Sequence, residues 1–427
     1  MSNIEYIATY DLPYSESAHA ACVKAGPWVF LNGIEAIEYH QGLDAGSAQS
    51  EGLPLHGLPK HRREGDAVAS RLQDLLARAN TSFTHTVRLD QYYSTWKAVD
   101  PYHRSRRAAF GDYIAPSTSV VMEELLVAGA DISNSLLAVV PGHGLDPQRV
   151  DPPKVAAPVW SGFVPAAIAG DLVFVAGQMA RGAEGADPRA HVPAHSRWGG
   201  FEARKQAEYV IDQRLAPALE AAGSSFKHAL KAQAYVRHLE DIPHFLEVWN
   251  DRFGARQVAL TIVQGSDFGL VDGSLEINLV ALRDKAAITK RVIECDIPDP
   301  ATYGAAAVHA GDLLYFSGLM ACDDDGAVAA VRNTVALSHL GVPARAEMTW
   351  LLSHARRICE AGGTSLENVT RAMQFHTDLS DFSGSLDAWR REGGIKAVPY
   401  CATRMRAHPV PHCRTVLDLW AYAPKGR

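Results

Sequence analysis

Three short apolar runs, each reaching a glycine at or near its end, recur along the chain at nearly equal spacing. They cover residues 28–34, 172–178 and 313–319 and consist mainly of aliphatic, β-branched and aromatic residues. Runs of this length are typical of buried strands, and the glycine lets the backbone turn without a Cβ clash. Gly33, Gly177 and Gly318 are 144 and 141 residues apart in a chain of 427 residues. The pattern therefore predicts three repeats.

A second marker keeps the same spacing. Ser82, Ser225 and Ser365 each follow a threonine or serine and precede a phenylalanine or leucine, and they are 143 and 140 residues apart. Because two independent markers are in register, we interpret the chain as three consecutive units. The predicted units are 1–143, 144–288 and 289–427.

Each unit has the same predicted order of strands and helices. The first unit contains the marked strand, a long helix, a strand at 87–93, a short helix at 101–110 and a hairpin at 117–140. The long helix is predicted from Val68, Leu72, Leu75 and Leu76, which have the spacing of a buried stripe. In the second unit, Pro217 lies inside the matching helix and predicts a kink or an early end.

One long helix covers one face of a small mixed sheet in each predicted unit, so the other face is apolar and needs cover. Three such faces in one chain can bury one another around a common axis. A closed arrangement also leaves no strand edge unpaired at the seams. We therefore predict an α+β protein of three mixed sheets, each with helices on one face, arranged as an intrachain pseudo-trimer.

Composition and charge favour small molecules as partners. Apolar residues make up 47% of the chain, charged residues make up 21%, and no apolar run is long enough to span a bilayer. The N-terminal segment lacks a basic region followed by an apolar core, so we expect no secretory signal and a cytoplasmic location. The net charge of −7 provides no basic surface for nucleic acid or a membrane, which leaves small molecules and further copies of this chain as expected partners. The six cysteines form no CxxC pair and are expected to be free thiols.

Four short motifs carry a family resemblance. They are Pro-Tyr-Ser at 13–15, Phe-Val-Ala-Gly-Gln at 174–178, Ser-Leu-Glu-Ile-Asn-Leu-Val-Ala-Leu at 274–282 and Ala-Gly-Gly-Thr-Ser-Leu-Glu-Asn-Val at 361–369. With these motifs the chain resembles three consecutive copies of the RidA/YjgF family of enamine and imine deaminases. The resemblance implies RidA-like (chorismate mutase-like) units with a barrel-like core and ligand clefts between neighbouring units. Because family members are usually homotrimers, this chain would be a covalent pseudo-trimer with three unequal clefts.

The chain departs from the family at the arginine that holds the substrate carboxylate. The matching positions are Thr118, Leu260 and Cys401, and none of them is an arginine. A shift in register would bring Arg256 or Arg404 into that role. The family's acidic position on the closing strand is matched by Glu276 in the second unit, by Asp418 in the third and by Ser133 in the first. Deamination of imino acids therefore does not carry over directly.

Cys401, Glu276 and Asp418 are the candidate catalytic residues. Cys401 is expected at the floor of a cleft, where a thiolate would attack an amide or imine carbon, and the alternative is a small buried filler. Glu276 and Asp418 are candidates for a general base or a water-positioning carboxylate. Backbone capping or pairing with an arginine is the alternative for both.

Further residues are expected to contact a substrate, with ordinary packing or backbone hydrogen bonding as the alternative. The predicted set is Tyr14, Thr118, Glu123, Gln178, Tyr303, Ser317 and Arg404. His408, His412 and Cys413 have the residue types of metal ligands, but no CxxC or HExxH motif accompanies them. We therefore expect no metal and no other cofactor.

These observations favour a hydrolase or deaminase that acts on the C–N bond of an amide, imine or enamine in a small polar metabolite, within a cleft between units. A non-catalytic binding or assembly protein that has lost the family's arginine is one alternative. A chorismate-cleaving type of enzyme is another. An enzyme should have one cleft where a cysteine or carboxylate meets a polar donor, whereas a binding protein needs only apolar walls.

Overall fold

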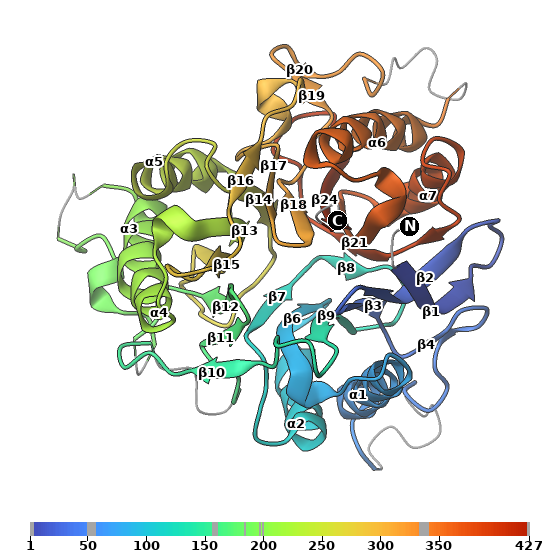
Figure 1. The fold of residues 1–427 in the computed structure, drawn as a ribbon, viewed down its shortest axis with the longest axis horizontal. Coiled ribbons are helices and arrows are strands. Elements are labelled where there is room, and N and C mark those ends of the chain that lie inside the picture. The colour runs from blue at the N-terminus through green and yellow to red at the C-terminus, as the bar shows by residue number, and fades with distance from the viewer. Residues whose placement is uncertain are drawn as a thin grey trace.

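The computed structural model describes residues 4–48, 57–155, 161–182, 185–195, 198, 200–332 and 341–424. The protein is a mixed α+β structure whose main strands form three mixed sheets, one after another along the chain. The sheets meet around the middle of the molecule and the helices lie on the outside (Figure 1). Within the described ranges, no helix is long and apolar enough to cross a bilayer.

The first sheet has the strand order β1-β2-β3-β9-β6-β7. Its strands are β1 (Ile4–Asp11), β2 (Ala18–Ala25), β3 (Trp28–Ile34), β6 (Thr86–Tyr93), β7 (Ser117–Val121) and β9 (Ile132–Val139). The predicted hairpin at 117–140 is wrong, because β9 lies between β3 and β6 and not beside β7. β7 returns from β6 through a helix and therefore pairs with it in parallel, while β9 is buried at every residue and takes a central place.

The other two sheets have the same order of strands along the sheet. The second contains β10 (Gln148–Val150), β11 (Ala166–Ala169), β12 (Leu172–Gln178), β15 (Leu275–Leu282), β13 (Ala229–Val236) and β14 (Ala259–Gln264). The third contains β16 (Arg291–Ile293), β17 (Ala307–Ala310), β18 (Leu313–Phe316), β24 (Thr415–Tyr422), β21 (Val369–His376) and β23 (Tyr400–Arg404). The three glycine-marked runs are confirmed as strands β3, β12 and β18, with β18 ending before its glycine.

Short strands close the seams between sheets. β22 (Ala397–Val398) pairs with β2, and β8 (Glu124–Leu125) pairs with β23, so the first and third sheets are joined at both places. A bridge between Val121 and Asp267 joins the first and second sheets. Two further small pairs, β4 (Ile37–Glu38) with β5 (Gly42–Leu43) and β19 (Cys322–Asp323) with β20 (Gly326–Ala327), lie in connections.

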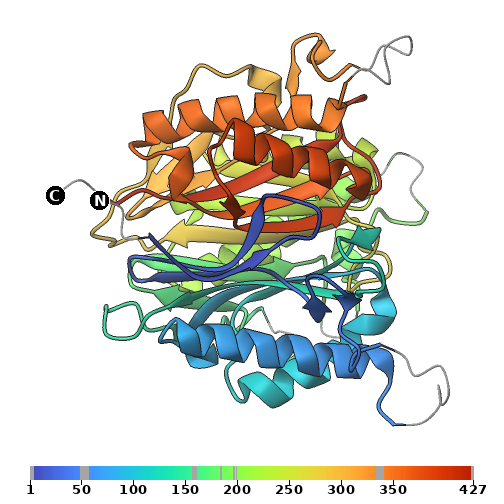
Figure 2. The same ribbon diagram turned by 90° about the vertical axis from the view of Figure 1, so that its right-hand side faces the viewer.

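The helices pack against the outer faces of the sheets (Figure 2). They are α1 (Lys60–Arg78), α2 (Val99–Phe110), α3 (Glu202–Tyr209), α4 (Ala216–Ala221), α5 (Ile242–Phe253), α6 (Pro343–Gly362) and α7 (Phe382–Arg391). The second long helix does not end early at Pro217, which lies in the first turn of α4, but its α-helical pattern is interrupted just before the proline. A π-helical segment at Val210–Leu215 separates α3 from α4, because proline supplies no N–H to the ladder and its ring displaces the carbonyl of Gln213.

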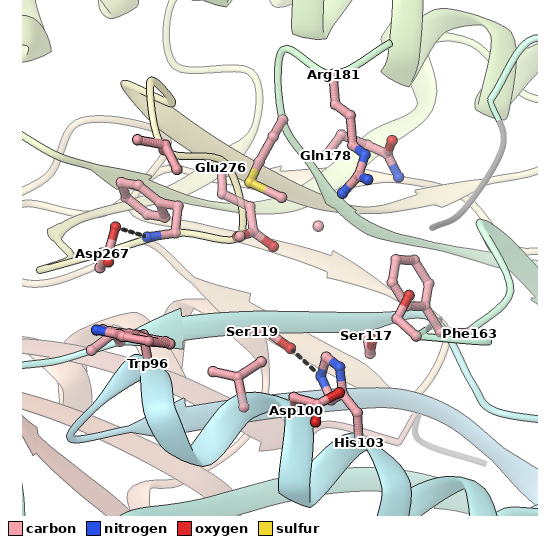
Figure 3. Close-up of a pocket in the computed structure, with 18 of the residues that line it drawn as sticks. Trp96, Asp100, His103, Ser117, Ser119, Phe163, Gln178, Arg181, Asp267 and Glu276 are labelled. Atoms are coloured by element: carbon pink, nitrogen blue, oxygen red, sulfur yellow. Dashed lines mark hydrogen bonds between the residues drawn. The ribbon is translucent and has the colours of Figure 1, made fainter. Parts of the chain in front are cut away.

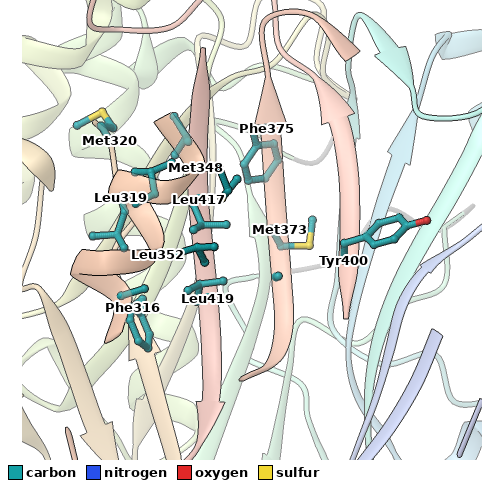
Figure 4. Close-up of a cluster of buried hydrophobic side chains, with 14 of the residues drawn as sticks. Phe316, Leu319, Met320, Met348, Leu352, Met373, Phe375, Tyr400, Leu417 and Leu419 are labelled. Carbon is teal, nitrogen blue, oxygen red and sulfur yellow. The ribbon is translucent and has the colours of Figure 1, made fainter. Parts of the chain in front are cut away.

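Apolar side chains fill both faces of each sheet. In the third sheet, Leu352 of α6 packs with Phe316, Leu417 and Leu419 in one outer cluster (Figure 4). On the inner faces, Phe30, Phe174, Tyr315 and Trp420 are among the residues of a central cluster drawn from all three sheets. The inner sheet faces therefore bury one another.

A charged network also lies in this buried centre. Arg88 donates two hydrogen bonds of 2.9 Å to Asp90, and Arg371 donates to the same carboxylate at 2.7 Å. Lys231 pairs with Asp418 at 2.9 Å, and both side chains are fully buried. The five residues come from β6, β13, β21 and β24, so all three sheets contribute charges, and two of the pairs, Arg371 with Asp90 and Lys231 with Asp418, join different sheets.

Candidate functional site

A cleft of about 730 Å³ lies between the first and second sheets. We call it the Glu276 cleft (Figure 3). One wall is formed by β7 and α2, and the opposite wall by β12 and β15. Its polar lining residues include Asp100, His103, Ser117, Ser119, Gln178, Arg181, Asp267 and Glu276, and its apolar ones include Phe163, Met179 and Phe268.

Glu276 is the buried carboxyl of this cleft. The backbone N–H of Ser119 donates a hydrogen bond to it, while Oε2 has no hydrogen-bond partner among the described residues. Burial raises the pKa of Glu276 to about 8, so the carboxyl is mainly protonated at neutral pH. The Glu276 side chain lies directly over residue 177, which must be a glycine, because a Cβ there would lie 1.9 Å from Oε1 of Glu276.

His103 and Ser119 face Glu276 from the other wall (Figure 3). The hydroxyl of Ser119 lies 3.5 Å from His103 Nε2 and accepts a hydrogen bond from Gln91 at 2.9 Å. Burial and the nearby Arg106 guanidinium hold the pKa of His103 well below its usual value, so the ring is neutral. Because Gln91 donates to this hydroxyl, the Ser119 proton is directed to His103, to Tyr93, with which Ser119 also hydrogen-bonds, or to a ligand.

Arg106 supports this wall from behind. Its guanidinium is fully buried and donates to Gln91 Oε1 at 2.6 Å, to Ser117 Oγ at 3.4 Å and to the Ser161 carbonyl at 2.6 Å. The strand positions that match the family's arginine lack that residue, but α2 brings this positive charge close to the same wall. The sequence reasoning missed it, because α2 and β7 are brought together only by the fold.

The wall formed by the second sheet holds Gln178, Arg181 and Arg214. Gln178 lines the cleft, but its Oε1 accepts from Arg214 at 3.1 Å and its amide donates to the Ala176 carbonyl at 3.2 Å. Arg181 extends along the same wall (Figure 3), and burial lowers its pKa. This guanidinium provides a positive charge on the side of the cleft opposite β7.

A second cleft, of about 610 Å³, lies between the third and first sheets. We call it the Glu35 cleft after its most buried acid. The predicted residues Tyr14 and Cys401 both line it. Burial raises the pKa of the Cys401 thiol to about 12. The reactive thiolate is therefore scarce at neutral pH, which favours the interpretation of Cys401 as a buried filler.

Cys401 should accordingly resist alkylation in the folded protein. At pH 7 a thiol with this pKa is ionised to only ~10⁻⁵, so iodoacetamide should modify it at least ~100-fold more slowly than it modifies free cysteine. Peptide mapping of the labelled native protein measures the rate, and the unfolded chain provides the control. Rapid labelling of Cys401 in the native state would restore it as a nucleophile.

Asp418 does not occupy the acidic position of the closing strand that was predicted for it from the sequence. In the first sheet Ser133 pairs with Tyr92, and in the second sheet Glu276 pairs with Tyr235. At the equivalent position of the third sheet, Phe375 pairs with Val416 and not with Asp418. Asp418 lies two residues further along β24, where it binds Lys231 in the buried centre. It lines neither of the two clefts.

The other predicted residues have mainly structural contacts. Thr118 accepts a hydrogen bond from Asn278 at 3.0 Å and faces the centre, so its neighbours Ser117 and Ser119 line the cleft instead. Ser317 accepts from the Leu260 N–H at 2.8 Å and donates to the Ala305 carbonyl. The remaining contacts are Glu123 with Ser266, Arg404 with Glu124, Arg256 with Thr302, Gly304 and Asp299, and Tyr303 with two apolar clusters.

At the junction between the second and third sheets, packed residues fill the positions that match Gly177 and Glu276 of the first cleft. A Cβ on Gly318 would lie 2.9 Å from both Thr261 and Val416, and one on Gly304 would lie 2.3 Å from the Val258 carbonyl. In the described ranges, no group of three or more histidine, cysteine, aspartate or glutamate side chains is arranged to hold a metal ion.

The buried glutamates predict a decrease of stability with pH. Burial raises the pKa of Glu276 and Glu35 to about 8 and that of Glu347 to about 7, from 4.5 in the unfolded chain. Between pH 4.5 and the pKa of each group, the folded state therefore binds more protons than the unfolded chain does. The stability that these carboxyls contribute is lost as pH rises towards 8. Buried His19, His376 and His408, with pKa values near 4, act in the opposite direction only below about pH 6.5.

Urea unfolding between pH 6.5 and 8 tests this expectation. The free energy of unfolding should fall by about 1.4 kcal/mol per pH unit for each carboxyl that is protonated only in the folded state. Glu276→Gln removes one such group and should flatten the slope. A slope that Glu276→Gln leaves unchanged would show that this carboxyl ionises normally.

Comparisons with known proteins found only partial structural similarities. No family model matches the chain, and no curated protein matches it. Solved structures of YjgF-type proteins and of a chorismatase are similar to parts of it. A YjgF family member from Neisseria meningitidis is 22% identical and matches over 34% of this chain and 100% of its own, with a TM-score of 0.26. The yeast protein YEO7 is 20% identical over 32% of this chain and 98% of its own (TM-score 0.27), and a chorismatase is 13% identical over 64% and 78% (TM-score 0.41).

Proposed function

We propose that this protein hydrolyses a C–N bond of a small polar metabolite, an amide, imine or enamine, in the Glu276 cleft. The observation that carries the proposal is the buried Glu276 carboxyl, which lines the cleft and has an oxygen without a partner among the described residues. A carboxyl that is protonated at neutral pH can donate a proton to a substrate nitrogen and take one back from water. Hydrolysis of a C–N bond needs both transfers.

For an imine, the proton steps balance at this single group. Glu276 protonates the imine nitrogen, and water adds to the carbon while its proton passes to the carboxylate. Glu276 then protonates the amine nitrogen of the adduct, ammonia leaves as the carbonyl forms, and the hydroxyl proton returns to Glu276. One water is consumed, one ammonia is released, and the carboxyl ends in its starting state.

The opposite wall is suited to the developing charge. Ser119 has a hydroxyl proton that can be donated to a substrate oxygen, and Arg106 lies behind it as a buried cation. Preorganised donors in a site of low dielectric stabilise such charge more strongly than water does. Arg181 on the other wall provides a partner for an anionic group of the substrate.

We further propose that the chain consists of three tandem RidA-like units, with boundaries at 1–143, 144–288 and 289–427. The common strand order of the three sheets and the equal spacing of the glycine-marked strands support this division. In this view the clefts correspond to the inter-subunit clefts of a trimer, and their linings have diverged.

Ammonia release tests the proposed activity. A panel of small amides, ureides, imines and enamines, with and without a carboxylate, is incubated with the protein, and ammonia is measured by a coupled assay. We expect release from at least one member. If no compound is hydrolysed while one still raises the melting temperature, the protein binds without catalysis and the hydrolase proposal fails.

A further inference from the structure

The Glu35 cleft contains a buried acid just after β3, whereas the acid of the Glu276 cleft lies within β15. Glu35 follows β3, two residues after Gly33, and its side chain is 94% buried (6% exposed). Oε2 of Glu35 has no hydrogen-bond partner among the described residues. A buried polar atom that lines a cleft without a partner is a place where a ligand group can bind.

The acids of the two clefts have exchanged positions. Ser133 in β9 pairs with Tyr92 as Glu276 in β15 pairs with Tyr235, so the first sheet has a serine where the second has the acid. Conversely, the residue two positions after Gly33 is the acid Glu35, whereas the residue two positions after Gly177 in the other cleft is Met179, which carries no charge. Ser133 hydrogen-bonds to the Glu35 carboxyl, so the smaller residue both leaves room for the acid and holds it.

Hydrogen-bond acceptors line the depth of this cleft. His19 Nε2 lies 3.1 Å from the carbonyl oxygen of Tyr400, which can only accept, so Nε2 carries the proton. Since His19 is neutral, its Nδ1 is the acceptor and the Tyr39 hydroxyl donates to it at 2.6 Å. The Tyr39 proton is thus committed, and its oxygen can only accept a further bond. A ligand here meets an acceptor at Tyr39, and Glu35, which is protonated in the empty cleft, becomes a second acceptor when an ammonium group displaces its proton.

The rest of the lining is aromatic and acidic. Tyr14, Phe382 and Tyr400 provide ring faces and edges, and Glu16, Glu38 and Asp387 provide carboxylates nearer the mouth. These three carboxylates are already paired with arginines: Glu16 and Asp387 with Arg390, Asp387 also with Arg391 and Arg345, and Glu38 with Arg71. The aromatic rings together with the Glu35 carboxyl, whose Oε2 has no partner among the described residues, favour a cation that donates hydrogen bonds.

We propose that the Glu35 cleft is a second, separate ligand site that binds a small primary amine with an apolar body, its ammonium group held by Glu35 and Tyr39. The amine donates to the two acceptors and its apolar part lies against Phe382 and Tyr400. This assignment is independent of catalysis in the Glu276 cleft, because the two sites share no lining residue.

Isothermal titration calorimetry of the full chain with 2-phenylethylamine tests the site. 2-Phenylethanol has nearly the same shape but a hydroxyl in place of the ammonium group. We expect the amine to bind with one site per chain and the alcohol to bind at least ~10-fold more weakly. Glu35→Gln should weaken amine binding at least ~10-fold, whereas Glu276→Gln, the matched change in the other cleft, should leave it unchanged.

Val127→Trp provides a second test if Glu35→Gln fails to fold. Val127 is half-buried at the lining of the Glu35 cleft, so an indole there should fill the space and abolish binding. Absence of amine binding at millimolar concentration, equal binding of amine and alcohol, or loss of binding in Glu276→Gln alone would each overturn the proposal. Failure of the ammonia-release assay would leave these binding results unaffected.

Discussion

Glu276→Gln should lower kcat/KM for ammonia release by about 10²–10⁴-fold, the range for loss of a positioned acid–base group. Glutamine keeps the shape and accepts the hydrogen bond from the Ser119 N–H, so the cleft should keep its form. It cannot donate and recover a proton in the way that C–N hydrolysis needs. Steady-state kinetics on the best substrate of the panel, with KM determined separately, measures the loss.

Glu347→Gln is the matched control. Glu347 is also a buried glutamate with a raised pKa and an oxygen without a partner among the described residues, but it accepts from the backbone N–H groups of Arg414 and Thr415 and lines neither cleft. The kcat/KM of the Glu347→Gln variant for ammonia release should stay within about twofold of the wild-type value. Glu276→Gln with wild-type kcat/KM would move the chemistry away from this cleft.

The pH profile gives an independent readout of the same group. Because the neutral carboxyl starts the reaction, kcat/KM of the wild type should be high below pH 8 and fall as Glu276 ionises above its pKa of about 8. The Glu276→Gln variant should lack this limb. A rate that instead rises through pH 8 would mean that the carboxylate acts first, as a base.

Asp418→Asn should destabilise the protein by about 3–5 kcal/mol, as expected when one member of a buried ion pair is removed. Lys231 has no exposed surface, and its ammonium group donates to Thr261 and to the Phe316 carbonyl, both at 2.6 Å, and pairs with Asp418. Without the carboxylate, a buried cation is left between Arg88 and Arg371. Urea unfolding at pH 7 measures the change.

The double variant Asp418→Asn, Lys231→Met separates loss of the pair from loss of shape. Removing both charges should recover part of the stability, because the uncompensated cation is gone. Glu124→Gln is the surface control: its partner Arg404 is solvent-exposed, and the change should cost less than about 1 kcal/mol. A single variant as stable as wild type would show that the buried pair contributes nothing.

The two acids named from the sequence differ for a reason that pattern alone does not reveal. Side chains on a strand alternate between faces, so a shift of two residues keeps a residue on the same face. Asp418 and Val416 therefore look equivalent along β24 until the pairing of Val416 with Phe375 fixes the register. Glu276 lines a cleft, and its flanking motif fixed its register within the sequence.

Other parts of the two clefts depend on contacts between distant segments. Arg106 comes from a helix, and Glu35 from the end of an early strand, and neither occupies a position that a strand motif would mark. The hairpin at 117–140 was wrong for a similar reason. Adjacent segments suggest a hairpin, but β9 gains more burial between β3 and β6 than at an edge.

The sequence by itself determined the local elements: the glycine-marked strands, the helices with apolar stripes and the interruption just before Pro217, since periodicity and backbone restrictions act over a few residues. Only the tertiary structure decided which acid faces a cleft, because that depends on register and on neighbours from another sheet. It likewise decided that Asp418 and Lys231 neutralise each other in the centre. Each charge needs the other because the three sheets have excluded water from both, and a buried charge without a partner is costly.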